Sequence, residues 1–391
     1  MVISGMSRKM KKPIYLDYNA TTPIAKEVAD AMLPYLYDHF GNPSSSHRFG
    51  VQAKLAIDLA RNQVANLLGA QPSEIIFTGG GTEANNHAIR GYCLQHQQRG
   101  NHIITSAIEH PAVLEVCRDL ERGGFDLTIL PVDEFGQVSP IDLKAAIRTD
   151  TILITIMHAN NEVGTLQPIK DLTSIARRHG IAFHTDAAQS IGKISVQVNE
   201  LGVDMVSITG HKLYAPKGVG VLYVRNGIEL KNLMFGAGHE SGRRPGTENL
   251  LEIVGLGKAC AIARRDLQTN QVHLLEMRDF LLTEIKKSLG EERVIINGHP
   301  EQRLPNTLSL GIRGTEAHQI LNQINDQVAI SAGSACHADS ITISSVLQAM
   351  QVPIDWAQGT LRFSVGRETT REEITLAVSI ISKAVESNDY P

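Results

Sequence analysis

The chain has 391 residues, of which 42% are hydrophobic and 20% are charged, and its formal net charge is −4 at pH 7. This length and composition predict a globular protein with two or three domains, or one large domain with a smaller partner. The slight acidic excess gives no indication of direct nucleic-acid binding. No run approaches the roughly 18 apolar residues of a membrane helix. The first residues lack the apolar region of a secretory signal. We therefore expect a cytoplasmic protein.

The first elements are an extended segment and two helices. Residues 13–23 read as extended, and helical spacing covers 25–37 and 52–68, with loop-forming residues 41–47 between them. An apolar strand at 74–78 then leads into three glycines and Thr82. Glycines allow the backbone to approach a ligand, and a helix start favours an anion such as phosphate. The alternative is a plain strand–turn–helix, because neither a Walker motif nor GxGxxG is present.

Strands and helices alternate in the next part of the chain. Strands are expected at 102–106, 127–132, 151–157, 181–185 and 205–209, and helices at 111–121, 140–147 and 168–179. This alternation predicts a mostly parallel sheet with helices on both faces. Ligands of such sheets gather at the carboxyl ends of the strands. The polar residues at those ends are Thr82, His110, Asn161, Asp186 and Lys212.

The remaining chain predicts a smaller α/β domain. A strand at 220–224 precedes a glycine-rich loop with paired arginines at 236–249, and a long helix is expected over 253–289. Strands at 294–296 and 307–311 follow, with helices at 316–325, 344–349 and 371–385. We expect this second domain to pack beside the first.

Three residues at the strand ends suggest cofactor chemistry. Lys212, in SITGHKLYAPKGVG, is either a surface lysine in a turn or a desolvated amine that forms a Schiff base with an aldehyde cofactor. Asp186 is either a helix N-cap or the partner of a protonated pyridine nitrogen. His110 is either structural or a ring that stacks on a cofactor and moves protons.

The four cysteines are widely spaced and no two of them form a CxxC motif, so neither a disulfide framework nor a metal site is expected. Cys93, Cys117 and Cys260 fall in helical patterns and read as buried hydrophobic residues. Cys336 lies in a predicted loop of Ser, Gly and Ala, next to His337, where it is either reactive or another buried residue. Arg362 and Arg367 could supply a clamp for a carboxylate.

An ordered set of motifs resembles the pyridoxal-phosphate-dependent cysteine desulfurases of the NifS/IscS-like kind, within the class-V aminotransferases. These motifs span about residues 15–370 and are YLDYNATTP, GNPSSSH, FTGGGTEANN, EHPAVL, HANNEVG, HTDAAQ, GHKLYAPKGVG, RPGTEN, LPNTLS, SAGSAC and RFSVGRET. The resemblance implies the fold type I of pyridoxal-phosphate-dependent transferases. Its large cofactor-binding domain, 22–262, would hold a mostly parallel seven-stranded sheet. A small α/β domain, 1–21 with 263–391, would carry the catalytic cysteine loop.

The resemblance also implies a function. L-cysteine is converted to L-alanine, and the sulfur stays as a persulfide for delivery to sulfur-acceptor proteins, in iron–sulfur cluster assembly or thio-modification. The cofactor is pyridoxal 5′-phosphate, and the protein is a homodimer with active sites at the interface.

Individual roles carry over from the matching motifs. Lys212 becomes the Schiff-base lysine, Cys336 the persulfide carrier, His110 the stacking and proton-moving residue, and Asp186 the pyridinium partner. The phenolic oxygen of the ring would be approached by Gln189 and Asn161, the second of which is also a candidate for substrate binding. The phosphate would be held by Gly81, Thr82, Thr209, His211 and, from the other subunit, Thr247, and Arg362 would take the substrate carboxylate.

Two features leave alternatives open. SACHADS and VPIDWAQGTLR look closer to selenocysteine lyases and to the desulfurases that serve DNA phosphorothioation than to the iron–sulfur branch. A catalytically silent adaptor in a sulfur-transfer complex is the alternative that is not an enzyme.

Overall fold

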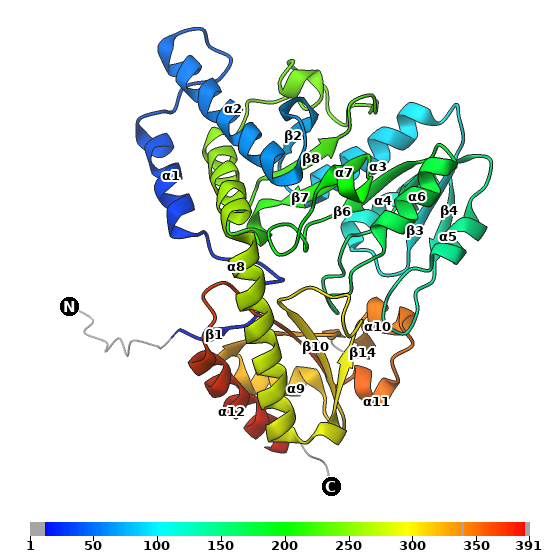
Figure 1. Ribbon diagram of the computed structural model, residues 1–391, viewed down its shortest axis with the longest axis vertical. Coiled ribbons are helices and arrows are strands. Elements are labelled where there is room, and N and C mark those ends of the chain that lie inside the picture. The colour runs from blue at the N-terminus through cyan, green and yellow to red at the C-terminus, as the bar shows by residue number, and fades with distance from the viewer. Residues whose placement is uncertain (1–11, 338–339, 388–391) are drawn as a thin grey trace.

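One lobe of the protein is built on a seven-stranded sheet with the order β2-β8-β7-β6-β5-β3-β4 (Figure 1). In the computed structural model, residues 12–337 and 340–387 are described, and between 334 and 342 the description covers the backbone alone. The strands are β2 (Ile75–Thr78), β3 (His102–Ser106), β4 (Asp126–Leu130), β5 (Thr151–Thr155), β6 (Ala182–Asp186), β7 (Met205–Thr209) and β8 (Gly220–Val224). Only β8 runs antiparallel to its neighbours in this sheet, so the predicted mostly parallel seven-stranded sheet is confirmed.

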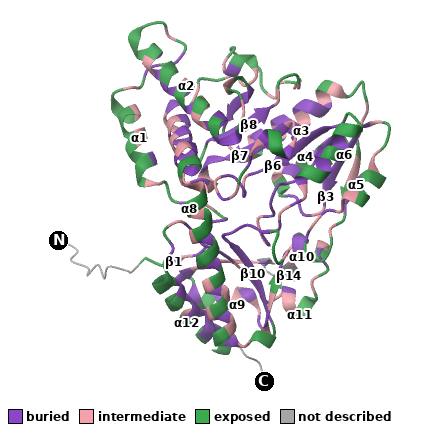
Figure 2. Cartoon of the chain, viewed as in Figure 1, coloured by how far each residue is buried: buried purple, intermediate pink, exposed green. Residues whose placement is uncertain are grey.

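Helices cover both faces of this sheet, and this explains why its central strands consist of buried residues. Every residue of the central strands β3, β5, β6 and β7 is buried, as expected for parallel strands enclosed on both sides. One apolar core lies under α3 (Gly81–His96) and α4 (Pro111–Arg122). The other lies under α2 (Arg48–Leu68), α6 (Ile169–Arg178) and the first part of α8 (Leu250–Leu289). Figure 2 shows the buried strands between helices with exposed outer faces.

A second lobe surrounds a four-stranded antiparallel sheet with the order β12-β15-β10-β9. These strands are β9 (Val294–Asn297), β10 (Thr307–Ile312), β12 (Ser331–Ala332) and β15 (Thr360–Ser364). The sheet packs on α9 (Ala317–Ile324) and α12 (Arg371–Ser387). The N-terminal strand β1 (Ile14–Tyr15) joins this lobe by pairing in parallel with β11 (Val328–Ala329).

The 40-residue helix α8 belongs to both lobes (Figure 1). Its buried residues up to Ala263 pack in the core of the large sheet, and those from Leu274 onward pack in the core of the second sheet. Asn249 caps its start by accepting a hydrogen bond from the backbone N–H of Glu252. The remaining helices are α1 (Lys26–Tyr37), α5 (Pro140–Ala146), α7 (Val198–Leu201), α10 (Ser345–Ala349) and α11 (Ile354–Ala357).

The segment around Cys336, predicted to be a loop, contains a short hairpin. Its strands are β13 (Ser334–His337) and β14 (Ser340–Ile343), and Cys336 pairs with Ile341. Small residues before the turn gave no strand signal, whereas the β-branched residues of β14 favour extended backbone. The segment is thus a hairpin attached to the second lobe, and the prediction of a loop was wrong for its backbone.

Candidate active site

Nine of the predicted site residues line one cavity of about 300 Å³ at the carboxyl edge of the large sheet. They are Gly81, Thr82, His110, Asn161, Asp186, Gln189, Thr209, His211 and Lys212. They come from the ends of four strands, β2, β5, β6 and β7, and from the segment after β3. The parallel topology brings these strand ends together.

One end of the cavity is suited to an anion. Helix α3 begins there at Gly81, and its N-cap, Gly80, has a φ of 150° with no atom within 4 Å of where a Cβ would lie. The first N–H groups of a helix have no partners within the helix and attract negative charge. Thr82, Thr209 and His211 line the cavity with Gly81. Burial, with a contribution from Lys212, lowers the pKa of His211 to about 4, so its ring is neutral at pH 7.

The carboxylate of Asp186 lies at the end of β6 and is 8% exposed. Its Oδ2 accepts a hydrogen bond from Asn85 Nδ2 at 2.7 Å, and its Oδ1 accepts one from the backbone N–H of Ala188 at 2.8 Å. Both oxygens therefore have fixed orientations. The buried Oδ1 of Asn85 has no hydrogen-bond partner among the described residues.

His110 caps the N-terminus of α4. Its Nδ1 accepts a hydrogen bond from the backbone N–H of Ala112 at 3.1 Å. Because Nδ1 is an acceptor, the proton of the neutral ring is on Nε2. Loss of solvation in the cavity wall, reinforced by Lys212, lowers the pKa of His110, and Asp186 opposes this shift. A neutral imidazole with one free N–H suits proton transfer.

Lys212 follows β7 in the short 3-10 helix Gly210–Lys212. Burial lowers its pKa from 10.5 to about 8, and the positive charge of Arg362 lowers it further, whereas Asp186 and Asp17 raise it. Its ammonium donates a hydrogen bond to the backbone carbonyl of Asn19. This environment keeps a substantial neutral fraction of the amine near pH 8.

Asn19 connects the cavity to the second lobe, although it was not among the predicted site residues. It is fully buried, and its carbonyl also accepts a hydrogen bond from Gln189 Nε2 at 3.0 Å. Its other polar groups bond to Asn161 O, Thr307 Oγ1, Ser364 Oγ, Asn306 Nδ2 and Lys193 Nζ. Asn19 lies within the motif YLDYNATTP and Asn85 within FTGGGTEANN. These two motifs are the sequence signal for Asn19 and Asn85, whereas Lys193 lies outside the motifs of the cysteine desulfurases.

Arg362 projects from β15 toward the same region, although it does not line the cavity. Its Nη2 donates to Asp17 Oδ1 and Ser331 Oγ, both at 2.8 Å, and its Nη1 donates to Asn161 O at 3.3 Å. Its buried Nε has no hydrogen-bond partner among the described residues. A guanidinium held in a fixed orientation is suited to bind a carboxylate.

One further predicted residue, Thr247, does not line this cavity, and for Cys336 the structure describes the backbone alone. Thr247 is exposed, in the loop before α8. The backbone of Cys336 is in β13, and its side chain lies outside the described part of the structure.

Comparisons with known proteins agree with this geometry. The family model for "Aminotransferase class-V" matches residues 14–376. The chain belongs to this family. Its resemblance to the cysteine desulfurases is confirmed by "Cysteine desulfurase IscS" of Dictyoglomus turgidum, which is 47% identical over 378 residues, 96% of this chain and 95% of that protein.

Solved structures of similar proteins have the same fold. A "NIFS-LIKE PROTEIN" superposes with a TM-score of 0.90 at 36% identity, covering 96% of this chain and all of that one. "SspA in complex with cysteine" gives a TM-score of 0.78 at 39% identity, covering 92% of this chain and all of that one. The predicted fold class is therefore confirmed.

Members of the class-V family are pyridoxal-phosphate enzymes, and the residues present fit that cofactor. The cavity combines an anion-binding helix start, a buried acid with fixed oxygens, a neutral imidazole and a lysine with a lowered pKa. In the part of the chain that the structure describes, no group of three or more His, Cys, Asp or Glu side chains could hold a metal ion. The described helices include none that is long and apolar enough to cross a membrane.

Proposed function

We propose that this protein is a cysteine desulfurase, which converts L-cysteine to L-alanine and keeps the sulfur as a persulfide on Cys336. The observation that carries the proposal is the gathering of Lys212, Asp186 and His110 around one cavity, next to the lobe that bears Cys336 (Figure 1). The high identity to proteins named cysteine desulfurase supports the same activity.

The other three cysteines make Cys336 the best candidate for the sulfur carrier. Cys93, Cys117 and Cys260 are fully buried. Burial raises the pKa of Cys117 and Cys260 to about 12 and that of Cys93 well above its ordinary value. Because the thiolate is the nucleophile, these three thiols are unsuited to attack a substrate.

Pyridoxal 5′-phosphate would supply an aldehyde for the substrate amine and a ring that accepts electrons. Its phosphate would be held by Gly81, Thr82, Thr209 and His211, and Thr247 of a second subunit would complete that site. Asp186 would keep a proton on the ring nitrogen, and Asn161 and Gln189 would approach the phenolic oxygen. His110 would face the ring.

The protein's own groups then have distinct tasks. Lys212 offers a neutral amine, and the guanidinium of Arg362 binds the substrate carboxylate. His110 moves a proton at Nε2. The Cys336 thiolate attacks the substrate sulfur: the new S–S bond forms as the C–S bond breaks, and the electron pair left on carbon takes up a proton. The balance is one thiol plus cysteine giving one persulfide plus alanine.

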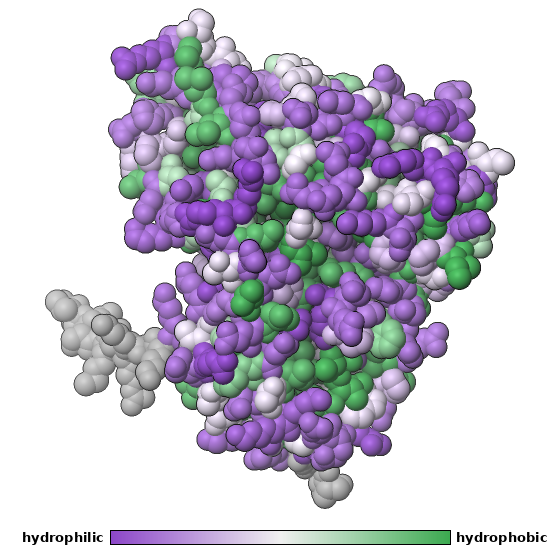
Figure 3. Space-filling view, viewed as in Figure 1, coloured by the Kyte–Doolittle hydropathy of each residue, from purple (hydrophilic) through white to green (hydrophobic). Residues whose placement is uncertain are grey.

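We also propose that the protein works as a homodimer. An apolar patch is exposed on α1, α2 and the segment between them: Leu33, Leu36, Tyr37, Phe40, Phe49, Val51, Leu55 and Leu59 are each at least 47% exposed. Figure 3 shows hydrophobic side chains along the outer end of α2. Exposed patches of this kind mark interfaces. A second subunit on this patch would account for the exposure of the patch and of Thr247.

We also propose a two-domain organisation of the chain and a cytoplasmic role in sulfur delivery. The two apolar cores along α8 support a cofactor-binding domain at 22–262 and a small domain formed by 1–21 and 263–391. Delivery of the persulfide sulfur to acceptor proteins in the cytoplasm completes the proposed role.

The test is incubation of the protein, loaded with pyridoxal phosphate, with L-cysteine and separately with L-selenocysteine, followed by assay for alanine. We expect alanine from L-cysteine, and loss of that activity in Lys212→Ala and Cys336→Ala. Turnover of L-selenocysteine alone would favour a selenocysteine lyase. An absence of cofactor absorbance together with an absence of alanine would favour an adaptor and refute the proposal.

A further inference from the structure

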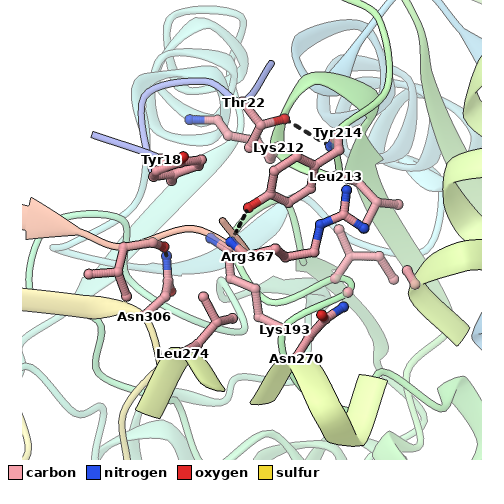
Figure 4. A pocket seen from close by; sticks show the side chains of 14 residues that line it. Tyr18, Thr22, Lys193, Lys212, Leu213, Tyr214, Asn270, Leu274, Asn306 and Arg367 are labelled. Atoms are coloured by element: carbon pink, nitrogen blue, oxygen red, sulfur yellow. Dashed lines mark hydrogen bonds between the residues drawn. The ribbon is translucent and has the colours of Figure 1, made fainter. Parts of the chain in front are cut away.

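A second lysine, Lys193, lies beside the active site and has no role in the chemistry described above. It is 7% exposed and lines a small cavity of about 20 Å³, which Lys212 also lines (Figure 4). Its Nζ donates hydrogen bonds to Asn19 Oδ1 at 3.1 Å and to Gln189 Oε1 at 3.0 Å. Gln189 lines the main cavity, and the backbone carbonyl of Asn19 accepts hydrogen bonds from Gln189 and Lys212, which both line it.

The surroundings of Lys193 favour a neutral amine. A neutral amine has two N–H bonds, and two acceptors are present. Among the ion pairs of the described residues, none includes Lys193, and a buried ammonium without a carboxylate partner is strongly disfavoured. Burial, with the nearby charges of Lys212 and Arg362, lowers the pKa of Lys193 well below its ordinary value. Lys193 therefore acts as a hydrogen-bond donor.

This donor and the backbone carbonyl of Asn19 together determine how the amide of Gln189 is oriented. Only the carbonyl oxygen of Gln189 can accept from Lys193, so its NH₂ group must be on the opposite side. There Nε2 donates to the carbonyl of Asn19, the same oxygen that accepts from Lys212. Gln189 lines the main cavity, and the second N–H of its Nε2 has no hydrogen-bond partner among the described residues, so it can be offered to the proposed cofactor.

Lys193 also completes the hydrogen bonds of Asn19. The side-chain oxygen of Asn19 accepts from Lys193 and from Asn306, and its side-chain nitrogen donates to Thr307 and to the Asn161 carbonyl. With every polar group bonded, Asn19 cannot rotate without breaking several hydrogen bonds at once. Its backbone carbonyl is thereby fixed against Lys212.

We propose that Lys193 is a positioning residue: as a neutral donor it holds the amide of Gln189 so that its second N–H is left for the main cavity, and it holds the Asn19 carbonyl against Lys212. The inference rests on the proposed function, because Gln189 would then present N–H to the phenolic oxygen of pyridoxal phosphate. A donor at that oxygen stabilises its ionised form and lowers the pH at which the bound cofactor loses its proton.

The test uses the absorbance of the bound cofactor as a function of pH, without substrate. In Lys193→Met the Gln189 oxygen loses its donor, and the amide is held by the Asn19 carbonyl alone. The titration midpoint should therefore move to higher pH by roughly one unit, the equivalent of about one hydrogen bond. Gln189→Ala should produce a similar shift. In the double variant the two shifts should not add, because Lys193 acts through Gln189. The matched control is Lys170→Met, at an exposed position of α6, which should titrate like the wild type.

A second variant covers the case in which Lys193→Met does not fold. Lys193→Gln keeps two N–H bonds, and its midpoint should stay within about threefold of the wild type. A wild-type midpoint in Lys193→Met or Gln189→Ala, or full additivity in the double variant, would overturn the inference. Failure of both Lys193 variants to fold would show a purely structural role and would also overturn it. If one of these contradicting results is obtained and the wild type still releases alanine from L-cysteine, only the inference about Lys193 fails. A wild type without cofactor absorbance would refute the proposed function as well.

Discussion

At the scale of single residues, the proposed chemistry depends on how the cavity changes the protonation of its side chains. Lys212 is the clearest case, because burial and Arg362 both disfavour its charged form. Its pKa of about 8 predicts how the cofactor-free protein captures pyridoxal phosphate. The neutral amine is the reactive form, and below the pKa its fraction falls about tenfold per pH unit. The capture rate, followed by absorbance, should therefore rise with pH and level off above about pH 8.

Arg362→Met provides a check on the sign of this effect. Removal of the guanidinium takes away a positive charge that lowers the pKa of Lys212 and leaves Asp17, which raises it. The midpoint of the capture profile should move to higher pH in this variant. A wild-type profile that continues to rise beyond pH 10, or a shift to lower pH in Arg362→Met, would contradict the assignment.

Asp186 leads to a second prediction at this scale. Asn in its place keeps the size and can still bond to Ala188, but it carries no negative charge to hold a proton on the ring nitrogen. We expect Asp186→Asn to bind the cofactor and to lose about 100-fold or more in the rate of alanine formation. The control is Asp142→Asn, at an exposed position of α5. A loss below about threefold would leave Asp186 without the proposed role.

The sequence predicted most of the residues of this site, because they belong to motifs at strand ends. Asp186 and Lys212 are separated by one strand–helix–strand unit, and the parallel sheet brings them to one edge. Lys193 and the hydrogen bonds of Asn19 could not be predicted. They depend on side chains from both lobes that meet only in the folded chain, and no periodicity or spacing reports such contacts.

At the scale of elements, the helices and strands followed their patterns closely. β3, β7 and β8 have the predicted bounds, because apolar β-branched runs between turn residues give clear limits. The strand β15 was not predicted, because its alternation of Thr, Arg and Ser with apolar residues was interpreted as a binding segment. The hairpin that contains Cys336 was not predicted, because its first strand, β13, lacks residues with a strong preference for strands.

Helix α8 carries a prediction about stability. Leu281 is fully buried in the core of the second lobe, whereas Leu275, on the same helix, is 43% exposed. We expect Leu281→Ala to lower the free energy of unfolding by about 2 to 5 kcal/mol, because the cavity it creates adds to the lost burial. Leu275→Ala should cost far less, since its side chain already contacts solvent. Equal losses for the two variants in denaturant titration would contradict the packing described for α8.

At the scale of the whole molecule, the exposed apolar patch on α1 and α2 predicts association. In the double variant Leu55→Asp/Leu59→Asp, the two introduced carboxylates should disfavour burial of this patch against a second subunit. Light scattering after size-exclusion chromatography should give a dimer for the wild type and a monomer for the variant. Ile141→Asp is the control, because Ile141 is 78% exposed and lies on α5, away from the patch. A monomeric wild type, or a variant that remains dimeric, would contradict the proposed interface.

The two lobes would have different parts in the proposed reaction. The large sheet provides the cavity that would hold the cofactor, and the second lobe brings Cys336 on a hairpin and Arg362 on β15. Asn19 and α8 hold the lobes together. Sulfur would thus leave the substrate at one lobe and be carried by the other.

The most direct test is mass analysis of the protein after incubation with L-cysteine, with alanine measured in the same sample. We predict one added sulfur atom at Cys336, no added sulfur at Cys93, Cys117 or Cys260, and alanine in proportion to the sulfur released. Cys336→Ala should retain the absorbance of the cofactor and acquire no sulfur. Sulfur on one of the buried cysteines, or alanine at the wild-type rate from Cys336→Ala, would contradict the account.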